Sequence, residues 1–197
     1  MLDKYRPAFL ILLAVLSAMT LPVCSFGQTT AEDFANRAMA KDIAGDSNGA
    51  IADYTKAIEL NPKLTYVYVN RGNAKVKSDL DGAFADYAKA IELNPRFTAA
   101  YYDRGSAKAK KGDLEGAIAD YTKAIELDPK NPIAYLYRGH AKEKGDLNGA
   151  IADYTKVIEL KPELAAAYLY RSAAKKKNGD QVGADEDFAQ AAKLKDP

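Results

Sequence analysis

The sequence repeats itself at an interval of about 34 residues. The residues Leu-Glu-Gly-Ala-Ile-Ala-Asp-Tyr at 114–121 return with few changes at 80–87 and at 147–154. The prolines that follow such segments, Pro62, Pro95, Pro129 and Pro162, are spaced 33, 34 and 33 residues apart. A period of this length restricts the fold strongly, because each unit is a small element that buries its apolar face only by stacking on its neighbours.

Each unit contains two segments with the apolar spacing of an amphipathic helix. In 114–127 the apolar residues mostly recur at intervals of three and four residues. Asp113 is a helix N-cap of the usual kind, and Pro129 ends the helix because proline disfavours helical backbone in the residue before it. A second helix is expected near 98–111. No segment alternates with a period of two, so we predict ten helices in five antiparallel pairs and no strands.

Large, small and aromatic residues recur at fixed places in every unit. The fourth residue is large, the eighth is small, and an alanine and an aromatic residue follow in the second helix. In that order the residues are Phe34, Tyr68, Tyr101, Tyr135 and Tyr168; Ala38, Gly72, Gly105, Gly139 and Ser172; Ala50, Ala83, Ala117, Ala150 and Ala184; Tyr54, Tyr87, Tyr121, Tyr154 and Phe188.

With this pattern, residues 31–197 resemble a run of tetratricopeptide repeats. The resemblance implies an all-α solenoid of five antiparallel helix-turn-helix repeats in a right-handed superhelical arc. First helices would line its concave face and second helices its convex face. The repeats would cover about residues 31–64, 65–97, 98–131, 132–164 and 165–197.

Three features depart from the pattern of that family. Lysine replaces the usual aromatic residue near the end of each first helix, at Lys41, Lys75, Lys108, Lys142 and Lys175. The second and fourth repeats lack one residue in the turn between their helices, so their first helices should be about one residue shorter. The last helix carries Asp185 and Gln190 at places that are otherwise apolar or basic, as a solvated end requires.

The first 27 residues have the organisation of a signal peptide. Lys4 and Arg6 precede an apolar run at 8–19, which is shorter than a membrane-spanning helix. Small residues at Ser25 and Gly27 favour cleavage before Gln28, with 28–30 as a short linker. We therefore expect an exported protein, periplasmic or secreted. The alternatives are an uncleaved N-terminal anchor and a lipid anchor at Cys24, which Val23 disfavours because a lipoprotein signal needs a small residue before its cysteine.

The composition argues against a catalytic or metal-binding role. His140 is the only histidine and Cys24 the only cysteine, so neither an ordinary zinc site nor a Ser-His-Asp triad is expected around His140. No Gly-rich phosphate loop is present, and we expect no cofactor. Residues 28–197 contain 26 basic and 26 acidic residues, and this neutrality disfavours nucleic acid as a partner.

An arginine and an aspartate recur in every unit. Because the family usually has an apolar residue where these arginines stand, we predict that each arginine meets a carboxylate, with the aspartate of its own repeat as first candidate. The pairs are Arg37 and Asp53, Arg71 and Asp86, Arg104 and Asp120, Arg138 and Asp153, Arg171 and Asp187. The lysines that end each first helix are interpreted either as a binding ridge or, preferably, as partners of the negative helix end.

The resemblance places a protein or peptide ligand in the concave groove. The groove positions of the first helices are Tyr66, Val69, Asn73 and Lys77; Tyr102, Ser106 and Lys110; Ile133, Leu136, His140 and Lys144; Leu169, Lys176 and Lys177. Tyr66 and Tyr102 favour binding because other aromatic residues already fill the core. A mixed apolar and anionic ligand is expected, since the residues that clamp an acidic tail in this family are not matched at Val69. The alternative function is a structural or self-associating component of a cell-envelope assembly.

Overall fold

The computed structural model describes residues 29–194, and these contain helices and turns but no strand. Residues from Ala31 onward form one compact unit. The predicted signal peptide, its cleavage site before Gln28 and Cys24 lie outside the described residues. Within 29–194, no helix combines the length and the apolar character that crossing a bilayer requires.

The described residues form the ten helices that the sequence predicts. Their bounds are α2 (Ala31–Ile43), α3 (Ser47–Leu60), α4 (Thr65–Lys75), α5 (Leu80–Leu93), α6 (Thr98–Lys111), α7 (Leu114–Leu127), α8 (Pro132–Lys142), α9 (Leu147–Leu160), α10 (Ala165–Lys177) and α11 (Gln181–Lys193).

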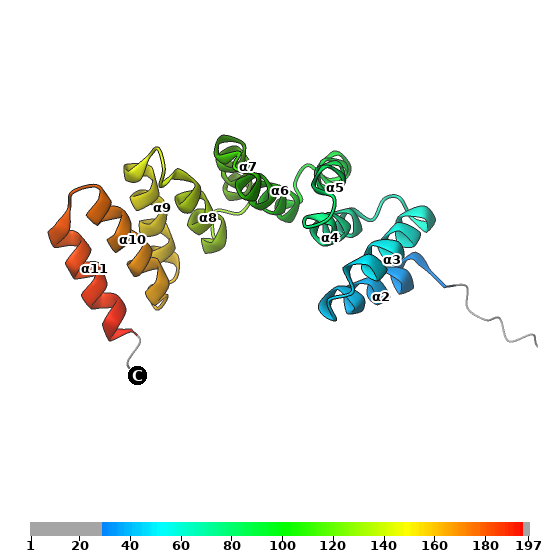
Figure 1. Cartoon of the computed structure of the whole chain (residues 1–197), viewed down its shortest axis with the longest axis horizontal. Helices are drawn as coiled ribbons and strands as arrows, with labels where there is room; N and C mark the ends of the chain where they lie inside the picture. The colour runs from blue at the N-terminus through cyan, green and yellow to red at the C-terminus, as the bar shows by residue number, and fades with distance from the viewer. Residues whose placement is uncertain (1–28, 195–197) are drawn as a thin grey trace, which may run out of the picture. The chain divides into compact units, whose positions relative to one another are not determined.

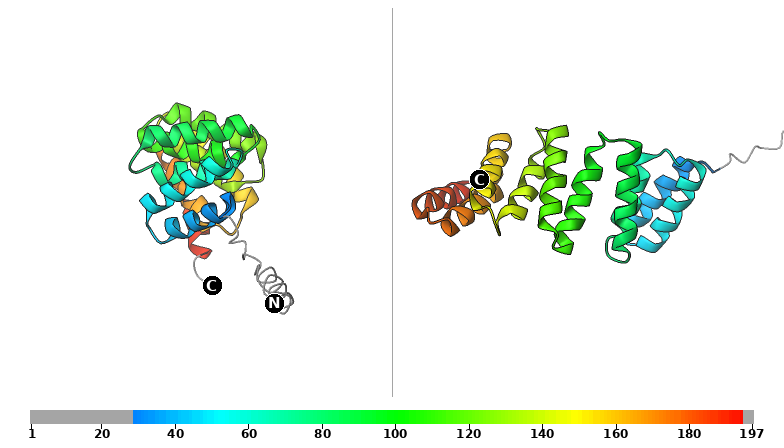
Figure 2. Two further views of the ribbon diagram at one scale, coloured as in Figure 1. Left: turned by 90° about the vertical axis from the view of Figure 1, so that its right-hand side faces the viewer. Right: turned by 90° about the horizontal axis from the view of Figure 1, so that it is seen from above.

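The helices pack as consecutive antiparallel pairs, α2 with α3 through α10 with α11, and each pair stacks on the next in chain order (Figure 1). Turning the molecule shows the helices side by side along the stack (Figure 2). The first helices of neighbouring repeats also touch, α2 with α4, α4 with α6 and α6 with α8. The chain is therefore an all-α solenoid of helix-turn-helix repeats. We call the surface formed by the first helices, α2, α4, α6, α8 and α10, the inner face.

Aspartate N-caps start every second helix. The side chain of Asp113, for example, accepts a hydrogen bond from the backbone N–H of Gly116, which satisfies one of the free amides of the first turn. Gly112 ends α6 with a positive φ of 91°. Gly45 and Gly179 have the same left-handed conformation after α2 and α10, the first helices of the first and fifth repeats.

The second and fourth repeats lack this left-handed glycine. Their first helices, α4 and α8, have 11 residues each, against 14 in α6. The predicted shortening is confirmed in direction, but it is larger than one residue. Without a residue in the left-handed conformation, the backbone N–H of Asp79 bonds directly to the carbonyl of Lys75, so the turn begins earlier.

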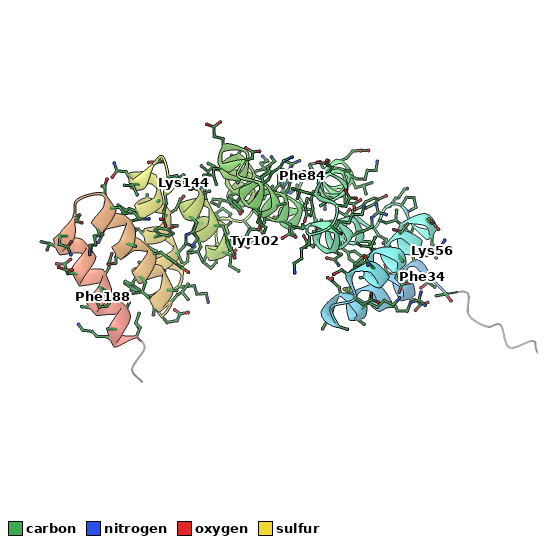
Figure 3. All side chains as sticks on the ribbon, in the orientation of Figure 1. Phe34, Lys56, Phe84, Tyr102, Lys144 and Phe188 are labelled. Atoms are coloured by element: carbon green, nitrogen blue, oxygen red, sulfur yellow. The ribbon has the colours of Figure 1, made fainter. Side chains whose placement is uncertain are left out.

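Between the two helices of the second, third and fourth repeats, one tyrosine packs on one glycine. Tyr87 and Tyr121 are fully buried. A Cβ atom added at Gly72 would lie 2.8 Å from a ring carbon of Tyr87, so the helices approach too closely there for a larger residue without a shift. Phe188 holds the same place in the last helix and is 62% exposed, because α11 is the last helix of the described part (Figure 3).

Candidate functional site

The predicted arginine–aspartate pairs are confirmed in all five repeats. Arg104 donates from Nε and Nη2 to the two carboxylate oxygens of Asp120, at 2.8 and 2.6 Å. The other four pairs have the same two-point geometry. The aspartates are 4–5% exposed, so each carboxylate is buried between the two helices of its repeat and needs these charged donors.

A lysine completes each of these clusters. Lys108 lies 2.9 Å from the second oxygen of Asp120, and the equivalent lysines contact their aspartates in the same way, at 2.8–3.0 Å. These lysines, Lys41, Lys75, Lys108, Lys142 and Lys175, therefore form ion pairs within their own repeats. The sequence analysis did not anticipate these ion pairs, which engage the ammonium groups that a binding ridge would need. We call each Arg–Asp–Lys group a clamp.

The clamps lower the pKa of the carboxylates for which a shift is resolved. Hydrogen bonds from Arg37, opposed by burial, hold the pKa of Asp53 at about 2. Burial tends to raise the pKa of Asp187, but the hydrogen bonds from Arg171 and Lys175 outweigh it and the net pKa is lowered. These carboxylates remain ionised at neutral pH and act structurally.

Three clamps also tie their repeat to the preceding one. The third nitrogen of Arg71, Nη1, donates to the hydroxyl of Thr55 at 3.1 Å, and Arg138 and Arg171 do the same with Thr122 and Thr155. Arg104 has no such partner, because the equivalent residue of the second repeat is Ala88. Consistently, α5 and α6 pack less extensively than the helices at the other repeat junctions.

Most of the residues predicted to line a groove reach the surface of the inner face. Asn73, Lys77, Lys110, Ile133 and Lys144 are exposed. Tyr66, Tyr102, Ser106, Leu136, His140 and Leu169 are half-buried. Lys176 and Lys177 are also exposed.

Val69 and Tyr66 have structural roles that the sequence did not indicate. Val69 is 3% exposed and packs in the core of the second repeat, so it offers almost no surface to a ligand. The hydroxyl of Tyr66 donates to the carboxylate of Glu32 in the first repeat. The hydroxyl of Tyr66 therefore helps to join α4 to α2, which makes it less available to a ligand.

A pocket of about 510 Å³ opens beside α4 and α6. Five of the predicted residues line it, namely Asn73, Lys77, Tyr102, Ser106 and Lys110. Further lining comes from Asp103, which the sequence analysis did not single out and which accepts a hydrogen bond from the amide of Asn73 at 3.0 Å. Burial raises the pKa of Asp103, and the hydrogen bond from Asn73 and the charge of Lys110 oppose the shift.

The buried tyrosines direct their hydroxyls toward residues of the inner face. Tyr87 donates to the amide oxygen of Asn73 at 2.6 Å. Tyr154 donates to Glu143 at 2.6 Å, so its oxygen accepts from His140 at 3.0 Å when Nδ1 of the ring carries a proton. His140 is thus held by a tyrosine of the core.

The hydroxyl of Tyr121 is different. In the described part of the chain it is the buried side-chain polar atom without a hydrogen-bond partner of good geometry. Ser106 is close enough to act on the pKa of Tyr121, which burial raises to about 12, but its hydroxyl forms no well-directed bond. Burial of an unpaired hydroxyl is unfavourable, so this part of the inner face is not fully satisfied by the chain's own groups.

A row of aromatic side chains crosses the inner face from α6 to α10. Tyr102 contacts Tyr137 with ring centroids 5.5 Å apart, Tyr137 contacts His140 at 6.2 Å, and His140 contacts Tyr170 at 4.4 Å. All three contacts are edge-to-face, the geometry that ring quadrupoles favour. Tyr102 lies where α6 adjoins α8 (Figure 3). We call Tyr102, Tyr137, His140 and Tyr170 the aromatic row.

The sequence analysis found only half of the aromatic row. Tyr137 and Tyr170 are 40% and 37% exposed, yet neither was among the predicted residues. The available signal was their place two residues after Tyr135 and Tyr168, where the earlier repeats carry Asn36, Asn70 and Asp103. A change from polar to aromatic residues at one place of the repeat distinguishes the fourth and fifth repeats.

We searched the described residues for groups of side chains with metal-ligand chemistry. Among residues 29–194, no three or more His, Cys, Asp and Glu side chains are gathered in an arrangement that could hold a metal ion. The cluster formed by His140, Glu143 and Tyr154 is joined to Lys177, which contacts Glu143 at 2.7 Å. This group links the fourth and fifth repeats.

Family comparisons agree with the helical pairs. A tetratricopeptide-repeat model matches residues 34–64 and 141–164, and a second model, described as TPR repeat, matches residues 105–144. Tetratricopeptide-repeat models therefore match the chain within residues 34–64 and 105–164. No curated protein matches the sequence.

Solved structures with a similar fold include two MamA proteins and YrrB. A crystal structure of MamA has 26% sequence identity and a TM-score of 0.75, over 84% of this chain and 92% of that one. MamA from Desulfovibrio magneticus RS-1 has 19% identity and a TM-score of 0.77, over 87% and 97%. YrrB, described as a TPR protein with an unusual peptide-binding site, has 22% identity and a TM-score of 0.69, over 85% and 88%.

Proposed function

We propose that this tetratricopeptide-repeat chain is a non-catalytic scaffold that binds a peptide or protein along its inner face. The observation that carries the proposal is the difference between the two kinds of residue on the first helices. The clamp residues are the same in every repeat and meet at a buried aspartate, whereas the residues between them differ from repeat to repeat and most are exposed or half-buried. Surface residues with no common structural task are available for recognition.

The character of the inner face supports a ligand with both apolar and anionic parts. Tyrosine supplies a large contact area at little entropic cost, and three of the tyrosines stand together in the aromatic row. Lys77, Lys110 and Lys144 are exposed along the end of the first helices, free of the clamps that engage the lysines two residues before them. An acidic group of a partner would find them within reach.

The proposal is tested by comparing an inner-face and an outer-face variant of the folded protein. The inner-face variant combines Lys77→Ala, Tyr102→Ala and Lys110→Ala. The matched control combines Lys56→Ala, Lys89→Ala and Lys123→Ala, which removes exposed lysines from second helices, each paired only with a glutamate of its own helix. Both are used for affinity purification from the native source, followed by binding measurements with each recovered partner.

We expect partners to be lost with the inner-face variant and kept with the control. A folded inner-face variant that retains every partner at unchanged affinity would refute the proposal. If size-exclusion chromatography shows that the recovered partner is a second copy of this chain, the self-associating alternative replaces the external partner.

We also propose that the protein is exported, with a mature chain that begins at Gln28. Support comes from the basic, apolar and small residues in sequence between Met1 and Gly27. Mass spectrometry of the protein recovered from the envelope and the medium tests the cleavage site. An intact Met1 on the exported protein would contradict cleavage, and a diacylglycerol on Cys24 would replace the soluble form with a lipid-anchored one.

A further inference from the structure

The aromatic row narrows the class of partner, and this inference rests on the proposed function of the inner face. The row runs across three first helices, from Tyr102 on α6 through Tyr137 and His140 on α8 to Tyr170 on α10. Its rings are held edge-to-face against each other, and Tyr154 contacts His140 from the core. Rings fixed in this way present a preformed surface with little ordering cost on binding.

The surroundings of the row restrict the backbone conformation of a ligand. First helices satisfy their own backbone groups, and residues 29–194 contain no strand whose edge could pair with an extended peptide. A ligand in β conformation would leave amide groups unpaired against ring faces. A polyproline II segment has no such requirement, because proline carries no N–H and the carbonyls project sideways as acceptors.

The carboxylates beside the row give a cationic ligand no free counter-charge. The carboxylates of Asp103 and Glu143 are already occupied, since Asp103 accepts from Asn73 and Glu143 is paired with Lys177 and Tyr154. The row itself is made of neutral tyrosines and one histidine, so it complements an uncharged segment. Beyond the row, exposed Lys110 and Lys144 stand toward the ends of the same helices and complement an acidic residue.

The dimensions of the row also agree with a polyproline II segment. The ring-to-ring steps of 5.5, 6.2 and 4.4 Å cover at most about 16 Å, which such a segment spans in about five residues. The steps of 6.2 and 4.4 Å through His140 place the rings of Tyr137 and Tyr170 at most about 11 Å apart, close to the rise of about 9 Å for one three-residue turn. Successive turns of the ligand could therefore meet Tyr137 and Tyr170, which occupy the same place in consecutive repeats.

We propose that the aromatic row binds a proline-rich segment in the polyproline II conformation, followed or preceded by an acidic residue that meets Lys110 or Lys144. Ring faces of the tyrosines pack on proline rings. Tyrosine hydroxyls donate to carbonyl oxygens of the segment. Among residues 29–194, the buried hydroxyl of Tyr121 lies beside Tyr102 and Tyr137 and has no well-directed hydrogen-bond partner.

Fluorescence anisotropy with three synthetic peptides tests the proposal. The first is an acetylated oligoproline that ends in two glutamates. In the second, alanines replace the prolines and favour a helix, and in the third a Gly-Ser chain of equal length replaces them. Each is titrated with the wild-type protein and with Tyr137→Ala, Tyr170→Ala and Tyr137→Phe, after circular dichroism has shown that each variant is folded. Phe188→Ala is the control, since it removes an exposed ring from α11, outside the row.

We expect the oligoproline to bind more tightly than the other two peptides. Tyr137→Ala and Tyr170→Ala should each weaken it by about tenfold. Tyr137→Phe should weaken it about threefold through the lost hydroxyl, and Phe188→Ala should have no effect. Equal or tighter binding of the alanine or Gly-Ser peptide, or unchanged oligoproline affinity in both tyrosine-to-alanine variants, would overturn the proposal.

The two proposals fail in different ways. If no peptide binds but the triple variant of Lys77, Tyr102 and Lys110 loses its native partners, the proline-rich class is wrong and the inner face remains the binding surface. If native partners are retained by the triple variant, the inner face is wrong as well.

Discussion

The clamps and the inner face belong to the same first helices, but they behave differently along the chain. Every clamp consists of an arginine, a lysine and a buried aspartate, with contacts that differ by only a few tenths of an ångström from one repeat to the next. On the inner face, the residue just before each clamp arginine changes from Asn36 and Asn70 through Asp103 to Tyr137 and Tyr170.

The difference shows how a repeat protein separates stability from recognition. A buried carboxylate tolerates no variation, because losing its donors leaves an uncompensated charge. A half-exposed side chain on the inner face contributes little to stability and can change between repeats. Two different surfaces result from this variation. One is the polar pocket beside α4 and α6, and the other is the aromatic row across α6, α8 and α10.

The largest expected effect is the loss of a clamp carboxylate. Asp153→Ala leaves Arg138 and Lys142 buried to more than four-fifths of their side chains without their counter-ion, and should cost about 3–5 kcal/mol of unfolding free energy. Asp103→Ala, on the inner face, should cost about 1 kcal/mol, since only the hydrogen bond from Asn73 is lost. Urea denaturation measures both. Similar losses in the two variants would contradict the division between clamps and inner face.

Acid should reduce the effect of removing a clamp carboxylate. The pKa of Asp53 is lowered from an unfolded value of 3.8 to about 2, so its contribution is present above pH 3.8 and is lost as the pH falls through 2. The difference in unfolding free energy between wild type and Asp53→Asn should therefore be largest near neutral pH and shrink toward pH 2. Denaturation curves measured at several pH values check this. A constant difference would mean that Asp53 is not held ionised by Arg37 and Lys41.

A smaller effect is expected at the junction between the second and third repeats. Ala88→Thr should give Arg104 the hydroxyl acceptor that Thr55, Thr122 and Thr155 supply elsewhere. After the lower helix propensity of threonine is taken into account, the gain should be about 0.5–1 kcal/mol.

The reverse change at the next junction is the matched control. Thr122→Ala removes the acceptor that Arg138 uses and should lower the unfolding free energy by a similar amount, as measured by urea denaturation. A loss of stability in Ala88→Thr would contradict the prediction. It would mean that α5 and α6 lie too far apart for the new hydroxyl to reach Arg104.

The smallest effect on stability is expected in the aromatic row. Tyr170→Ala removes a ring that is 37% exposed and one edge-to-face contact with His140, so the unfolding free energy should fall by about 1 kcal/mol or less. Thermal unfolding followed by circular dichroism measures the change. A loss comparable to that of Asp153→Ala would assign the row to the structural core and remove the reason for proposing it as a binding surface.

Much of the interior of each repeat could be predicted from the sequence. The period and the prolines set the helix pairs, and the co-occurrence of Arg104 and Asp120 in one repeat was enough to pair them. These contacts lie within a single helix-turn-helix unit, where helical geometry and a short turn fix which residues face each other. The place of Lys108 in the same cluster could have been found by the same reasoning, since it stands four residues after Arg104 on the same helix face.

Contacts between repeats were decided by the tertiary structure. The sequence alone placed Val69 on the surface and overlooked Tyr137 and Tyr170, because the burial of a first-helix residue depends on how far each repeat rotates relative to the one before it. That rotation follows from the fit of side chains between repeats, as in the core cluster that joins Tyr87 and Ala90 of the second repeat with Ala100 of the third, and no local pattern encodes it. The sequence by itself therefore determined the repeating unit and its clamp. The packing of one unit on the next decided which side chains remain exposed to a partner.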